Sequence, residues 1–82
     1  MKLLEMFIFD NEKTSKFLNL KYVNFLSDDS YLGILPSHAP MLSYIKKGKI
    51  FFRDEKNNQN SILLEKDGIL EIQNNKISIF LI

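Results

Sequence analysis

The chain has 82 residues, of which 45% are hydrophobic, 11 are basic and 10 are acidic, and none is cysteine. This length predicts one domain, residues 1–82, and the apolar content excludes a disordered tail. The net charge of +1 argues against a dedicated binder of nucleic acid or of anionic membranes, and a small domain without disulfides fits an intracellular location.

The first apolar run, residues 2–9, is interrupted by Glu5 and is followed by the charged Asp10 and Glu12 without a small-residue cleavage site. A signal peptide needs a longer unbroken apolar region and such a site, so the run predicts a β-strand. No stretch has the roughly 18 consecutive apolar residues of a membrane-spanning helix. The sequence therefore predicts a soluble domain.

Short apolar runs bounded by turn residues follow one another along the whole chain, and this pattern is typical of β-strands. No segment has the caps and periodicity of a useful amphipathic helix. About eight or nine short strands predict an all-β fold, either a β-sandwich or a small barrel. The predicted strands are residues 2–9, 17–20, 21–26, 31–35, 41–46, 49–53, 61–64, 68–73 and 76–81.

The last two predicted strands form a hairpin around the dipeptide Asn74-Asn75. A two-residue turn needs φ > 0 at both positions, which asparagine tolerates better than most residues. This register places Leu70, Ile72, Ile77 and Ile79 on one face and Glu71, Gln73, Lys76 and Ser78 on the other. A slip of one residue scrambles both faces, so the turn and the hydrophobic pattern predict the same register.

Residues 33–42 contain two prolines, Pro36 and Pro40, which fix φ, remove N–H donors and push the preceding residues toward extended backbone. The segment between them is a stiff loop that presents Ser37 and His38, the only histidine. One interpretation is a rigid connection between two sheets. The other, which we favour, is a presented binding surface, because a rigid loop loses little entropy on docking.

His38 alone does not predict chemistry, because a catalytic histidine needs an orienting acid and a nucleophile or substrate within reach. Asp28 or Asp29 is a candidate acid, and a small enzyme built on such a pair is a third, weaker hypothesis. One histidine and scattered carboxylates lack the spacing of a metal site. The sequence predicts no catalytic residue, no metal ligand and no cofactor.

Residues 46–53 mix lysines with Ile50, Phe51, Phe52 and Arg53 on a predicted hairpin. The alternative function is therefore a small β-barrel that binds single-stranded nucleic acid through Phe51, Phe52, Arg53 and the lysines. Such binding weakens steeply with salt. In the simpler interpretation, Ile50 and Phe52 point into the core while Phe51 and Arg53 point to the other face.

Residues 33–42, Gly-Ile-Leu-Pro-Ser-His-Ala-Pro-Met-Leu, resemble the Gly-Val-Leu-Pro-Gly-His-Ala-Pro-Leu-Leu signature of the ε subunit family of F-type ATP synthases. Residues 67–80 are similar to a second family segment, Gly-Gly-Phe-x-Glu-Val-x-x-Asn-x-Val-Thr-Val-Leu, so the resemblance spans essentially the whole chain. Among its departures, Ser37 and Asp67 replace glycines, and Tyr31 stands where an acid is common. Ser37 must therefore avoid or tolerate φ > 0.

The resemblance implies a flattened β-sandwich of about eight to ten short strands. It implies a non-catalytic rotor subunit of the central stalk, which couples the γ subunit to the polar loops of the c-ring during proton-driven ATP synthesis. Such a subunit is peripheral on the cytoplasmic face of the inner (plasma) membrane through its complex. The family commonly adds an inhibitory C-terminal helical hairpin, and since this sequence stops at Ile82, we expect that regulation to be missing.

The resemblance also implies two contact regions. The residues expected on the c-ring side are Asp28, Asp29, Tyr31 and His38, and those expected on the γ side are Pro40, Met41, Leu42 and Ser43.

Overall fold

A computed structural model describes residues 2–27 and 29–82, and these residues contain eight β-strands and no helix. The all-β prediction is confirmed, with the strand count at the lower end of the expected range. The strands are β1 (Leu4–Phe9), β2 (Thr14–Ser27), β3 (Ser30–Ile34), β4 (Met41–Ile45), β5 (Gly48–Asp54), β6 (Gln59–Leu64), β7 (Gly68–Gln73) and β8 (Lys76–Leu81).

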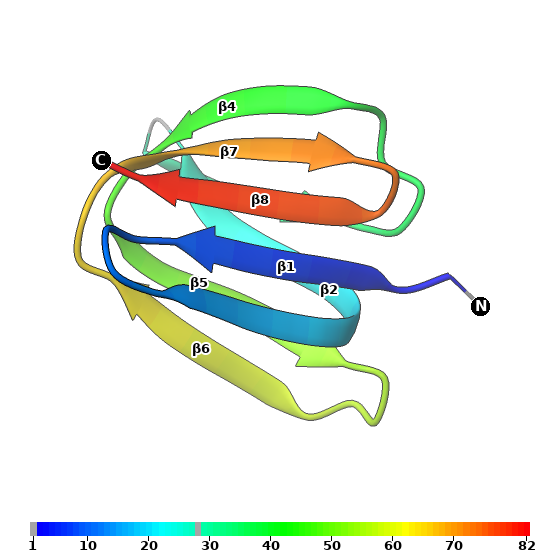
Figure 1. Cartoon of the computed structure of the whole chain (residues 1–82). Helices are drawn as coiled ribbons and strands as arrows, with labels where there is room; N and C mark the ends of the chain where they lie inside the picture. The colour runs from blue at the N-terminus through cyan, green and yellow to red at the C-terminus, as the bar shows by residue number, and fades with distance from the viewer. Residues whose placement is uncertain (1, 28) are drawn as a thin grey trace.

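The strands form a sandwich-like arrangement in which β2 belongs to both layers. The order along the sheet is β4-β7-β8-β1-β2-β5-β6, and β3 also pairs with β2. β1 and β8 are parallel, and the other pairs are antiparallel. Figure 1 shows β4, β7, β8 and β1 side by side in one layer, with β2 curving away from β1 toward the second layer, which holds β5 and β6.

The prediction of two short strands, residues 17–20 and 21–26, is wrong, because one continuous strand covers both. Asn19 has φ 60° in the middle of β2, and the pairing with β5 shifts between Leu20 and Tyr22. Such a bulge bends a strand without ending it. The bend lets the first part of β2 pair with β1 and the last part pair with β3 and β5.

The hydrophobic core lies between the two layers and takes residues from all eight strands. Burying one such aliphatic or aromatic side chain is worth about 1.5–3 kcal/mol relative to leaving it exposed. The buried residues are Leu4, Met6, Ile8, Leu20, Val23, Phe25, Ile34, Ile45, Ile50, Phe52, Leu64, Leu70, Ile72, Ile77 and Ile79. Because successive side chains of a strand point to opposite faces, the residues between these core positions face outward.

The predicted register of the β7–β8 hairpin is confirmed, from Gln73 opposite Lys76 to Leu70 opposite Ile79. Asn74 and Asn75 have φ values of 52° and 63°, as a two-residue turn of this kind requires. The predicted inward residues are buried. Ser78 lies on the outer face of the hairpin, as expected, but unlike a solvated residue it is buried there.

Candidate functional site

The proline loop joins β3 to β4 and is fastened to the β7–β8 turn. Ser37 takes a left-handed φ of 67°, so the loop tolerates a positive φ without the glycine that the resemblance leads one to expect. The backbone N–H of Ser37 donates a hydrogen bond of 2.6 Å to Oδ1 of Asn75. The loop is therefore stiffened by its prolines and by one tertiary hydrogen bond.

His38 is half-buried in this loop, and its Nδ1 lies 2.7 Å from the backbone oxygen of Ala39. A carbonyl oxygen only accepts hydrogen bonds, so Nδ1 carries the proton. In the neutral ring Nε2 is then a free acceptor. This arrangement suits a hydrogen bond to a partner and provides no acid to activate the ring.

The β2–β3 turn and the start of β3 carry two of the predicted site residues, Asp29 and Tyr31, on the exposed surface. Asp29 has φ 65° and forms an ion pair of 3.1 Å with Lys46. Both side chains are well exposed, so this pair contributes little to stability. The Tyr31 ring packs against Phe51 at a centroid distance of 6.0 Å. Asp28 lies outside the residues that the structure describes.

Among the described residues expected on the c-ring side, His38 lies apart from Asp29. Asp29 pairs with Lys46 just after β4, whereas the proline loop, which includes His38, precedes β4 and touches the β7–β8 turn. Figure 1 shows β4 running between these two ends of the molecule. A five-residue strand spans about 14 Å, so His38 and Asp29 are too far apart for a catalytic pair.

The four residues expected on the γ side alternate in direction, as strand geometry requires. Leu42 and Pro40 are exposed. Met41 packs against the hydrophobic core. Ser43 is half-buried, and its hydroxyl donates a hydrogen bond to the backbone oxygen of Tyr44 at 3.1 Å. Only the first two of these side chains are well placed to meet a partner.

Sequence reasoning missed an apolar face on the outer side of the layer that contains β4, β7, β8 and β1. Four of its residues form one row across the strands, because Tyr44 pairs with Ile69, Ile69 with Phe80, and Phe80 with Phe9. The Phe9 and Phe80 rings stack at 5.0 Å. We call this surface the apolar face; it comprises Phe7, Phe9, Leu42, Tyr44, Ile69 and Phe80.

A signal for this face is present in the sequence. On the predicted polar side of the β7–β8 hairpin, Glu71 pairs with Ser78, and the next pair on the same side is Ile69 with Phe80. Two bulky apolar residues on a face that is expected to be solvated indicate a covered surface. In the structure Tyr44 is 60% exposed, Phe80 45% and Ile69 38%.

The basic and aromatic residues of β5 divide between the two faces, as the simpler interpretation predicted. Phe52 is buried in the core, so it is not available to the nucleic-acid alternative. Phe51 packs against Tyr31 with the two rings tilted, and the Arg53 guanidinium lies 5.8 Å from the centre of the Tyr22 ring. The outer face of β5 is thus largely engaged with its own neighbours.

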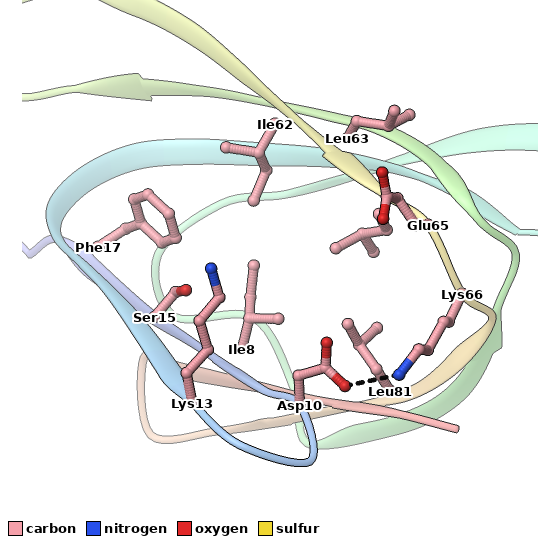
Figure 2. Close-up of a pocket in the computed structure, with 11 residues that line it drawn as sticks. Ile8, Asp10, Lys13, Ser15, Phe17, Ile62, Leu63, Glu65, Lys66 and Leu81 are labelled. Carbon is pink, nitrogen blue, oxygen red and sulfur yellow. Dashed lines mark hydrogen bonds and ion pairs between the residues drawn. The ribbon is translucent and has the colours of Figure 1, made fainter.

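A pocket of about 390 Å³ opens between the β1–β2 connection and β6. Figure 2 shows apolar side chains, among them Ile8 and Phe17, around it and the ion pair between Asp10 and Lys66 at its edge. The bond from Lys66 measures 2.8 Å. It acts with the backbone N–H of Asn11 to hold the pKa of the Asp10 carboxyl below its ordinary value.

Across residues 2–27 and 29–82, no three His, Cys, Asp or Glu side chains are grouped in a way that could hold a metal ion. The same residues include no helix that is long and apolar enough to cross a membrane.

Known proteins resemble this chain in sequence. The ATP synthase epsilon chain of Clostridium botulinum is 34% identical over 76 residues, which are 93% of this chain and 56% of that relative. ATP synthase epsilon chain 2 of Photobacterium profundum is 39% identical over 51 residues, which are 62% of this chain and 35% of the relative. The chain therefore spans about half or less of the length of these relatives.

Two solved structures share the fold at low sequence identity. A chain of the Tetrahymena thermophila mitochondrial ATP synthase central stalk and c-ring matches with a TM-score of 0.76 and 16% identity, covering 99% of this chain and 64% of that one. A chain of the Euglena gracilis mitochondrial ATP synthase matches with a TM-score of 0.82 and 8% identity, covering 96% and 50%.

The family model described as "ATP synthase, Delta/Epsilon chain, beta-sandwich domain" matches residues 10–81. This match covers most of the sequence and agrees with the fold and with the two motifs, and the chain therefore belongs to the ATP synthase delta/epsilon family.

Proposed function

We propose that this chain is a non-catalytic rotor subunit in the central stalk of an F-type ATP synthase. In this role it couples the γ subunit to the c-ring during proton-driven ATP synthesis, and it lies inside the cell, peripheral to the membrane. Family membership and the stalk origin of the fold neighbours support the proposal. Torque passes through rigid contacts, so the role requires surfaces and no chemistry.

The apolar face is the observation that carries the proposal. Its residues come from four strands of one layer, which gives a stiff platform rather than a flexible loop. Exposed contiguous apolar surface of this kind marks a protein interaction site. Leu42, one of the residues expected on the γ side, lies on this face, so we assign the face and the adjoining proline loop to γ.

The two ends of the molecule suit two partners. We propose that Asp29, just before β3, and Tyr31, near the start of β3, contact the polar loops of the c-ring together with Asp28. His38 lies at the other end of β4, beside Pro40 and the γ-facing residues. We therefore move His38 to the γ contact, where its free Nε2 accepts a hydrogen bond.

The γ contact is tested by titrating the chain into the α3β3γ assembly of the same organism. Replacing Ile69 and Phe80 together by threonine keeps strand propensity and removes apolar area, so we expect affinity to fall at least tenfold. Leu63→Thr, which removes an exposed leucine from β6, is the matched control and should bind like the wild type. Failure of the wild type to bind, or full affinity of the double variant, would contradict the proposal.

The c-ring contact needs a separate measurement. We expect Asp29→Lys with Tyr31→Ala to reduce retention of the enzyme head on c-ring-containing membranes while leaving binding to α3β3γ unchanged. His38→Ala should show the reverse pattern. If both variants affect both measurements equally, the division into two ends is wrong.

A further inference from the structure

A polar dish adjoins the apolar face on the same outer surface. It exists because a small residue, Ser78, sits between large cross-strand neighbours, Phe7 on β1 and Glu71 on β7. We call it the Ser78 dish. Its lining residues are Glu5, Glu71, Gln73, Asn74, Lys76 and Ser78.

Ser78 is the first indication that the dish binds something. Only 7% of the residue is exposed, although it lies on the outer face of the sheet. Among the hydrogen bonds of the described residues, none involves its hydroxyl. Most of the residue is covered by its neighbours, but Ser78 lines the open dish. Its hydroxyl is therefore placed to bond a group that enters from outside.

The charges around the dish specify that group. Glu5 and Glu71 place two carboxylates at its edge against one lysine, Lys76, so the dish is net negative. The Lys76 ammonium lies 5.0 Å from the centre of the Phe7 ring. The Phe7 ring therefore already interacts with a cation. A positively charged side chain is the complement of this arrangement.

Arginine fits the dish better than lysine does. Its planar guanidinium has five N–H donors, enough to bond a carboxylate in bidentate fashion and a hydroxyl at the same time. It also stacks on aromatic rings, and Phe7, which pairs with Ser78 across the strands, supplies one beside the dish. Arginine is enriched among the residues that dominate protein interfaces, especially where apolar surface surrounds them and excludes water.

We propose that the Ser78 dish receives an arginine side chain of the γ subunit when γ covers the apolar face. This inference rests on the proposed function and names the polar anchor of that interface. Glu71 is the principal acceptor, because it lies directly across from Ser78. The dish fixes the position of γ along the face, which a purely apolar contact does not.

The test is calorimetric titration of the full chain into the α3β3γ assembly at about 50 and about 500 mM NaCl. Glu71→Gln is exposed and isosteric, so it leaves the fold intact. We expect it to weaken binding at least tenfold at low salt and to remove most of the salt dependence. Ser78→Val, which fills the dish, should weaken binding to a similar degree. Glu12→Gln makes the same charge change beyond the opposite end of β1 from Glu5 and outside the dish, and it should bind like the wild type.

The outcomes separate the inference from the proposed function. If the wild type binds and both Glu71→Gln and Ser78→Val bind with an affinity within twofold of the wild type, the arginine anchor is wrong. The proposed rotor role is unaffected by that result. No binding by the wild type overturns both. A loss of affinity in Ser78→Val counts only if this variant is as thermally stable as the wild type. If it is less stable, the affinity of Glu71→Gln alone decides the question.

Discussion

The backbone N–H of Ser37 and the side-chain oxygen of Asn75 are joined by a 2.6 Å hydrogen bond, and both residues have left-handed backbone, with φ values of 67° and 63°. This bond connects the two sequence motifs that carry the family resemblance. The proline loop is thereby held against the β7–β8 turn, at the edge of the apolar face. The position of the presented loop depends on a residue almost forty positions away in the chain.

Replacing Asn75 with glycine isolates this bond. Glycine suits the turn, so we expect the free energy of unfolding to change by less than about 1 kcal/mol. The Ser37 amide loses its acceptor, and since a net hydrogen bond is worth about 1 kcal/mol, its hydrogen exchange should accelerate about fivefold. Nuclear magnetic resonance measures both. Asn74→Gly, the other position of the turn, should leave exchange at Ser37 unchanged, and equal effects of the two variants would contradict the assignment.

Ser37→Gly should stabilise the protein slightly. A residue with a Cβ in left-handed backbone costs roughly 1–2 kcal/mol of stability, which glycine would recover. Glycine also gives the unfolded chain more freedom, and this lowers stability by about 0.4–1 kcal/mol. We therefore expect the free energy of unfolding in urea to rise by up to about 1.5 kcal/mol. Ser37→Ala keeps the Cβ and the N–H donor and should show no gain. A gain as large in alanine would mean that φ at this position is not strained.

The sequence was sufficient for features that local chemistry decides. The Asn74-Asn75 turn has one register that agrees with the hydrophobic pattern, and the structure has that register. β2 was harder, because its bulge at Leu20 leaves no distinctive residue pattern. The predicted break falls between residues 20 and 21, whereas the left-handed residue of the strand is Asn19. Asparagine suits both a turn and a left-handed residue within a strand, so its presence does not distinguish the two.

The candidate site was harder to predict because it depends on neighbours that are distant in sequence. Asp29 and His38 are only nine residues apart in the sequence, but they lie at opposite ends of β4. His38 is in the loop before this strand, and Asp29 pairs with Lys46 just after it. The apolar face needs the parallel pairing of β1 with β8, which brings Phe9 beside Phe80. A pairing across most of the chain length cannot be inferred from the alternation of either strand alone.

Stability should fall as the pH drops below about 5, and Asp54 should account for part of the loss. Its Oδ1 accepts hydrogen bonds from the backbone N–H groups of Asn58 and Lys56, at 3.0 and 2.9 Å. The bond from Asn58 is the main cause that lowers the pKa of this carboxyl. A lowered pKa in the folded state means that the stabilisation is present above the unfolded pKa and is lost as pH falls through the folded one.

Urea unfolding between pH 7 and pH 3 tests this assignment. Asp54→Asn removes the ionisable group, so we expect a shallower dependence of stability on pH between about 5 and 3 than in the wild type. Glu12→Gln removes an exposed carboxylate that accepts none of the hydrogen bonds found among the described residues. This control should keep the wild-type slope, and a slope in Asp54→Asn as steep as the wild type would show that other groups cause the loss.

Gly68→Ala should destabilise the protein, because a Cβ at this position would lie 2.7 Å from the backbone oxygen of Phe80. The contact is with backbone of the paired strand, which cannot move aside as a side chain can. Overpacking of this kind costs about 1–3 kcal/mol. Gly33→Ala is the matched control, since no atom lies within 4 Å of its Cβ position, and it should be neutral or slightly stabilising. Thermal unfolding of the two variants gives the comparison, and a Gly68→Ala protein as stable as Gly33→Ala would mean that β7 and β8 do not approach this closely.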